Sequence, residues 1–152
     1  MALWAIVPVK PLRRGKSRLA GTLTEDERTQ LNQELLEHTL KTLTEVKELD
    51  HILVVSRDPH ALTIARNYGS KTVQEDGQPL FKYRTHFRAT VVAQIHATHG
   101  VLVLPADLPL FKNRRCHRVG LIEQRNLPVV VIAPDRHKKG NKCFAHGPCW
   151  ID

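Results

Sequence analysis

The sequence lacks the apolar runs and the N-terminal pattern that send a chain into or across a membrane. No segment of its 152 residues approaches the length and hydrophobicity of a membrane span, and residues 1–9 lack the charged start and cleavage site of a signal peptide. We therefore expect a cytoplasmic protein with no membrane partner. Cysteine is also scarce. Cys116, Cys143 and Cys149 cannot all pair, and cytosolic thiols would stay reduced.

A P-loop is absent too, although one tripeptide resembles the end of that motif. Gly15-Lys16-Ser17 has the right order, but a P-loop needs another glycine five residues before its terminal Gly-Lys-Ser/Thr. Lys10 occupies that position, and Pro11 follows it. The Walker type of nucleotide site is therefore excluded.

What the sequence does contain is a basic loop directly after an apolar run. Residues 3–9 predict a buried strand, and the loop that follows carries five cations around Gly15: Lys10, Arg13, Arg14, Lys16 and Arg18. Cations that leave a buried strand are badly placed for packing and well placed to bind phosphate, which Gly15 would let backbone N–H groups approach. A solvated basic turn is the alternative. The position after a strand favours phosphate binding.

Strand and helix patterns alternate along the rest of the chain. We expect strands at 51–56, 71–75, 101–104 and 129–133, and helices at 25–45, 59–68, 86–98 and 118–125. A capping box, Thr24 to Glu27, begins the first helix, whose inner stripe includes His38. This alternation predicts one α/β domain with a mostly parallel sheet in three layers. Ligands of such sheets lie beyond the carboxyl ends of the strands, where the strand order reverses.

Asp107 follows a predicted strand and lies between Pro105 and Pro109. A carboxylate at such a strand end is suited to hold Mg²⁺ against triphosphate oxygens, while Lys16 and neighbouring cations clamp the phosphates. A turn or an N-cap is the alternative role for Asp107.

Asp58 and Glu75 follow two other predicted strands. Both are weaker candidates for nucleotide binding, with capping or surface roles as the alternative.

Several segments, in order, resemble the 2-phospho-L-lactate or phosphoenolpyruvate guanylyltransferases. They are Trp4–Lys10, Gly15–Leu19, Val54–Pro59, Gln74–Gly77, Leu102–Leu110 and Val130–Asp135. The resemblance implies a nucleotidyltransferase fold of the glycosyltransferase-A type. It also implies transfer of GMP from GTP to the phosphate of a three-carbon acid, with release of pyrophosphate, in the synthesis of a deazaflavin coenzyme. No covalent enzyme nucleophile is needed, because alignment and charge neutralisation would carry the catalysis.

The same resemblance assigns site residues. It implies that Lys10, Gly15, Lys16, Ser17 and Arg18 form the triphosphate loop and that Asp107 binds the metal. With Pro8, Asp58 and Glu75 these loop residues are the nucleotide-binding candidates, and Lys16 and Arg18 are the catalytic candidates. Mg²⁺ is the expected cofactor, and GTP and a small phosphorylated acid are the expected partners. A homodimer is left open.

Three segments depart from the family pattern: 81–87, 113–120 and the tail 141–152. Codons can be chosen for each so that reading one base later gives family-like sequence. For the tail, the shifted frame restores the family's Gly-Thr-Asn motif after Gly140. We hypothesise that the three are translated out of frame, within one incomplete domain whose C-terminal part is missing. A gene whose second frame encodes nothing family-like there would contradict this hypothesis.

The departures change how the charge and the cysteines are interpreted. Seven cations lie in or beside the first two segments, against a net charge of +8, so the charge says little about partners: Lys82, Arg84, Arg88, Lys112, Arg114, Arg115 and Arg118. Cys143, His146 and Cys149, with Cys116 and His117, imitate a zinc-ligand set that the frame hypothesis also explains. Two hypotheses therefore remain as alternatives to a guanylyltransferase. One is a non-catalytic nucleotide- or nucleic-acid-binding module, and the other is a zinc-stabilised module. The family's late Asp-rich motif is absent, so we expect nucleotide binding even if this chain is inactive.

Overall fold

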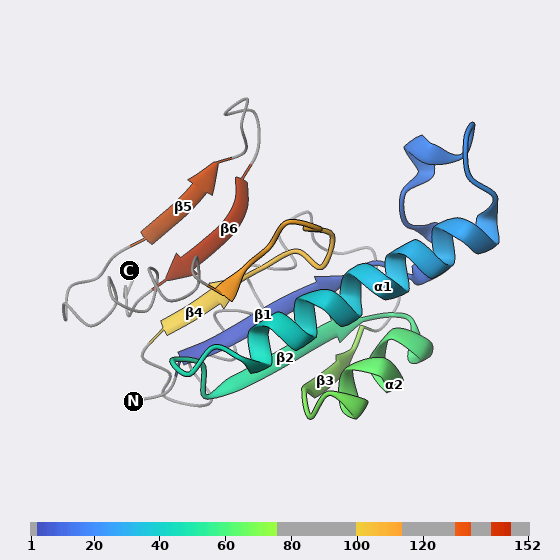
Figure 1. Ribbon diagram of the computed structural model, residues 1–152. Coiled ribbons are helices and arrows are strands. Elements are labelled where there is room, and N and C mark those ends of the chain that lie inside the picture. Colours follow the sequence, from blue (N-terminus) through green and yellow to red (C-terminus); the bar gives the residue numbers. More distant parts are fainter. Residues whose placement is uncertain (1–2, 76–99, 114–129, 135–140, 147–152) are drawn as a thin grey trace.

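The computed structural model describes residues 3–75, 100–113, 130–134 and 141–146, which form one six-stranded sheet with two α-helices (Figure 1). The strands are β1 (Leu3–Val9), β2 (His51–Ser56), β3 (Lys71–Gln74), β4 (Gly100–Val103), β5 (Val130–Pro134) and β6 (Asn141–His146). The helices are α1 (Glu25–Thr44) and α2 (Pro59–Asn67), with short 3₁₀ turns η1 (Leu12–Arg14) and η2 (Ser17–Leu19). The predicted helices at 86–98 and 118–125 lie outside the described residues.

The strand order β3-β2-β1-β4-β6-β5 places β1 at a reversal of the chain. From β1 the chain runs outward through β2 and β3, all parallel, and then returns to pair β4 with the other side of β1. Ile6 therefore lies between Leu53 on β2 and Val103 on β4. A reversal of this kind opens a crevice beyond the carboxyl ends of the two strands, here β1 and β4.

One strand runs against the others. β6 is antiparallel to both β4 and β5, so β5 points the same way as β1 to β4. The prediction of a mostly parallel sheet is confirmed, with β6 as the exception. A strand at 141–146 was not expected, since these residues begin the tail that departs from the family pattern.

Local signals set the helix ends. At the start of α1, Glu27 N–H donates to Thr24 Oγ1 (3.3 Å) and Thr24 N–H donates to Glu27 Oε2 (2.8 Å), the predicted capping box. The hydrogen bond from the Thr24 backbone lowers the pKa of the Glu27 carboxyl. Asp58 caps α2 with Pro59 in its first turn, and Gly69 follows the helix at φ 73°.

Both faces of the sheet are buried. On one face, Ala5 and Val7 pack with Leu36 and Leu40 of α1 and Leu62 of α2, and the two helices lie together there (Figure 1). On the other face a second cluster forms around Trp4 and Ile6. Burial of both faces explains why β1 reads as a continuous apolar run. The described residues supply one helical layer; none of their helices is long and apolar enough to cross a membrane.

Candidate nucleotide and metal site

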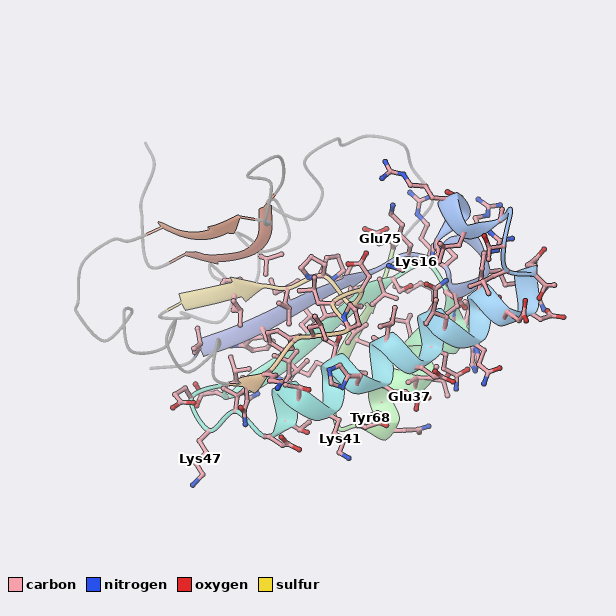
Figure 2. The ribbon with its side chains drawn as sticks, turned by 45° about the horizontal axis from the view of Figure 1, so that its top comes forward. Lys16, Glu37, Lys41, Lys47, Tyr68 and Glu75 are labelled. Carbon is pink, nitrogen blue, oxygen red and sulfur yellow. The ribbon has the colours of Figure 1, made fainter. Side chains whose placement is uncertain are left out.

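The basic loop and the Asp107 segment meet at the carboxyl ends of β1 and β4. Lys16 Nζ lies 3.2 Å from Asp107 Oδ2, although the two residues are 91 positions apart in sequence. The side chains are 27% and 53% exposed, so the pair faces solvent rather than the core. Figure 2 shows Lys16 and Glu75 at this end of the sheet, and Lys41 and Lys47 far from it. The structure thus brings together the predicted phosphate ligand and the predicted metal ligand.

Leu12 attaches the basic loop to the fold. Its side chain is buried in the core, 2% exposed. Its N–H donates to Asp58 Oδ2 (2.8 Å), and its carbonyl accepts from Asn32 Nδ2 of α1 (2.7 Å). The loop is therefore fixed at its base while its cations remain outside.

Position 15 has no room for a side chain, because Asn32 packs against it. Its φ is −72°, which any residue adopts, but a Cβ there would lie 2.4 Å from Asn32 Nδ2. The structure therefore gives Gly15 a packing role. Its expected part in letting backbone N–H groups approach phosphate stays a prediction.

Lys16 has a left-handed backbone. With φ 55° and ψ 37°, it is the one non-glycine residue of positive φ in the described segments. This conformation is unfavourable for a residue with a Cβ and is often found at functional sites. Here the left-handed conformation turns the chain from η1 into η2, and the Lys16 side chain points toward Asp107.

α1 also holds the Asp107 segment. Thr39 Oγ1 lies 3.4 Å from the carbonyl of Ala106, and His38 Nε2 lies 3.2 Å from the carbonyl of Phe111, a residue that is itself buried. Leu104 N–H donates to the carbonyl of Ile6, which continues the β1–β4 ladder to the site. Asp107 thus extends from a segment that is fixed on both sides.

The other predicted site residues differ in their positions and contacts. Both carboxylate oxygens of Asp58 accept backbone hydrogen bonds, from Leu12 and His60, which favours its capping role. Glu75 Oε2 lies 3.4 Å from Arg57 Nε at the ends of β3 and β2. Pro8 is half-buried within β1. Lys10, Ser17 and Arg18 are exposed on the loop; within the described segments no ion pair is formed by Lys10 or Arg18.

Sequence reasoning missed Asn32 and Thr39, and it placed His38 on the helix stripe without assigning it a contact. The available signal was polar residues on the inward, otherwise apolar face of an amphipathic helix. Their partners are backbone carbonyls of distant loops, which residue spacing does not identify.

The residues at this site fit a magnesium ion whose coordination shell is completed by phosphate oxygens of the substrate. No group of three His, Cys, Asp or Glu side chains forms a metal cage in the described segments. Asp107 is a half-exposed carboxylate beside Lys16, a cation for which we predict phosphate binding. Mg²⁺ commonly binds through one or two carboxylates plus substrate phosphates. The proposed zinc ligands Cys116, His117 and Cys149 lie outside the described residues.

Comparison with known proteins identifies the family. Residues 3–146 match the family described as "Guanylyl transferase CofC like". The chain belongs to this family. It is 32% identical to a phosphoenolpyruvate guanylyltransferase of Sphaerobacter thermophilus over 97% of this chain and 70% of the relative. It is 28% identical to a 2-phospho-L-lactate guanylyltransferase of Methanocaldococcus infernus, over 86% and 55%. The chain therefore spans between about half and 70% of the length of these curated relatives.

Solved structures support the fold. A putative nucleotide-diphospho-sugar transferase from Desulfovibrio desulfuricans superposes with a TM-score of 0.75 at 15% identity, over 97% of this chain and 64% of that one. A CMP:2-keto-3-deoxy-manno-octonic acid synthetase gives 0.61 at 14% identity, over 97% and 74%. These superpositions confirm the predicted nucleotidyltransferase fold. The family match over residues 3–146 confirms the predicted family.

Proposed function

We propose that this chain binds GTP at the Lys16–Asp107 site and transfers GMP to the phosphate of phosphoenolpyruvate or 2-phospho-L-lactate. The observation that carries the proposal is the 3.2 Å approach of a loop lysine to a strand-end carboxylate at the sheet's reversal point. The names of the family's curated members give the base and the two acceptor acids. Because both substrates are small soluble phosphates, we place the reaction in the cytoplasm.

In the proposed reaction an oxygen of the acceptor phosphate attacks the α-phosphorus of GTP. The bond from that phosphorus to the bridging oxygen breaks, and pyrophosphate leaves with the electron pair. Lys16 and Arg18 hold the triphosphate and stabilise the negative charge that develops on the leaving group. When Mg²⁺ is bound by Asp107 and phosphate oxygens, it adds further charge neutralisation. The loop residues Lys10, Gly15 and Ser17 contribute binding, and Pro8 and Glu75 are further candidate nucleotide contacts.

The test begins with GTP binding to the full 152-residue chain, measured by calorimetry with and without Mg²⁺ and compared with ATP and CTP. We expect saturable binding of GTP that Mg²⁺ strengthens and that Lys16→Ala weakens by at least about tenfold, since a charge-assisted contact is lost. Lys41→Ala is the matched control, because Lys41 is an exposed lysine of α1 distant from the site (Figure 2).

Pyrophosphate release is then followed with each acceptor acid. GTP binding without pyrophosphate release would refute the proposed transfer reaction and favour a non-catalytic nucleotide-binding module. Binding to DNA that weakens steeply with salt, without GTP binding, would favour the nucleic-acid alternative and refute the proposal. An equal loss of GTP affinity in Lys16→Ala and Lys41→Ala would show that the nucleotide does not bind at this loop.

A further inference from the structure

Asn32 lies directly beneath the basic loop. It is a half-buried residue of α1, and its Nδ2 donates to the carbonyl of Leu12 at 2.7 Å. The same side chain fills the space beside the Cα of Gly15: a Cβ built there would lie 2.4 Å from Nδ2, 2.8 Å from Cγ and 2.9 Å from Oδ1. One amide group therefore contacts the loop at two points, three residues apart.

These two contacts fix the turn that precedes Lys16. Leu12 begins η1, and Gly15 directly follows its last residue, Arg14. The next residue, Lys16, adopts φ 55°, and from that backbone conformation its Nζ lies 3.2 Å from Asp107 Oδ2. A left-handed lysine has an unfavourable local energy, so neighbouring contacts must hold it in place. The Asn32 side chain contacts the segment immediately before Lys16 at both Leu12 and Gly15.

We propose that Asn32 is a positioning residue for Lys16. By holding the Leu12 carbonyl and occupying the space beside Gly15, it fixes the backbone that directs the lysine toward Asp107. The inference rests on the proposed function only in giving Lys16 a phosphate to bind; the effect of Asn32 on the loop is independent of any ligand.

Asn32 is a better residue to mutate than Asp58, the other side chain that holds Leu12, because replacing Asn32 should affect only the loop. Asp58 also caps α2, so its replacement would affect a helix as well as the loop. Asn32 is in the interior of α1, where alanine is the better helix former, so Asn32→Ala should leave the helix intact.

Hydrogen exchange of the free protein gives the readout that needs no ligand. The amides of Arg14 and Leu19 donate to the carbonyls of Pro11 and Lys16 within the loop. In Asn32→Ala we expect both to exchange about tenfold faster, as a local opening, while the amide of Leu62 in α2 stays unchanged. The matched control is Gln33→Ala, because Gln33 is the next residue of α1 and contacts Glu37 rather than the loop.

A steric cycle tests the second contact. Gly15→Ala alone should accelerate loop exchange, because its methyl group meets the Asn32 amide. In the Asn32→Ala background that methyl group has room, so Gly15→Ala should add little further acceleration.

A binding cycle tests the link to Lys16. Asn32→Ala should weaken GTP binding about tenfold in the wild-type background and have almost no effect in a Lys16→Ala background, because residues that act through one another are not additive. Additive losses would mean that Asn32 does not act through Lys16, and loop exchange in Asn32→Ala that matches Gln33→Ala would overturn the inference entirely. If the wild type binds no GTP, the proposed function fails, while the exchange experiments still decide the role of Asn32.

Discussion

Replacing Lys16 by glycine should give a more stable protein than replacing it by alanine. Both variants lose the ion pair with Asp107, so their comparison isolates the backbone. That pair joins side chains that are 27% and 53% exposed, and an exposed pair is worth only about 0–1 kcal/mol. The difference between the variants depends on φ 55° at position 16, where alanine keeps the Cβ that glycine lacks.

The magnitude is the balance of two effects. A left-handed conformation costs a residue with a Cβ roughly 1–2 kcal/mol. Glycine loses about 0.4–1 kcal/mol more than alanine on folding, because its unfolded chain is more flexible. The free energy of unfolding of Lys16→Gly should therefore exceed that of Lys16→Ala by about 0.5–1 kcal/mol. For a chain of this size the corresponding rise in Tm is about 2 °C.

Denaturant titration at constant m-value is the assay, with thermal unfolding as a second measurement. Arg13 supplies the control, because it is exposed in η1, where the backbone is helical. There the order should reverse, with Arg13→Ala about 0.5–1 kcal/mol more stable than Arg13→Gly. If Lys16→Ala equals or exceeds Lys16→Gly in stability, residue 16 does not hold a positive φ in solution. Both Lys16 variants should lose GTP affinity, so that Lys16→Gly is the more stable of two variants that bind GTP weakly.

Three further predictions concern carboxylates and the helix cap. Asp107→Asn should change the free energy of unfolding by less than about 1 kcal/mol, as expected for an exposed pair, and should abolish the strengthening of GTP binding by Mg²⁺ in calorimetry; an undiminished magnesium effect would place the metal elsewhere. Because the folded-state pKa of Glu27 lies below its ordinary value of 4.5, Glu27 stabilises the fold above that pH and loses this contribution as the pH falls through the folded-state pKa. Wild type should therefore exceed Glu27→Gln in stability at pH 7 and converge with it in acid, and a constant difference across pH would contradict the capping box. Thr24→Ala should cost about 1 kcal/mol at neutral pH.

Elements with local causes could be predicted from sequence. β1 is a continuous apolar run, and β2 has the apolar run Ile52–Val55 at its centre. The capping box of α1 and the Asp-Pro start of α2 determine where those helices begin. β6 has no such signal. It forms because β4 and β5 present edges on either side of residues 141–146, a cause that no local pattern contains.

The site follows the same division. That Lys16 and Asp107 lie at one edge of the sheet follows from the ends of parallel strands, so their proximity could be expected. The reason for Gly15 could not, because it depends on the packing of a side chain 17 residues later. The left-handed backbone of Lys16 was equally hidden, since sequence favours glycine at such positions and here the glycine stands one residue earlier with a negative φ.

A single helix relates the two halves of the site. Asn32, in the interior of α1, holds the basic loop, and His38 and Thr39, about two turns further on, hold the Asp107 segment. The sheet alone fixes only where β1 and β4 end; beyond those ends the chain needs further support to hold a solvent-facing lysine and carboxylate 3.2 Å apart. Since α1 is anchored in the core by Leu36 and Leu40, both fully buried, a change in its packing would shift both loops together. The distance between cation and carboxylate should therefore be more sensitive to the three polar contacts of α1 than to the volume of its apolar residues.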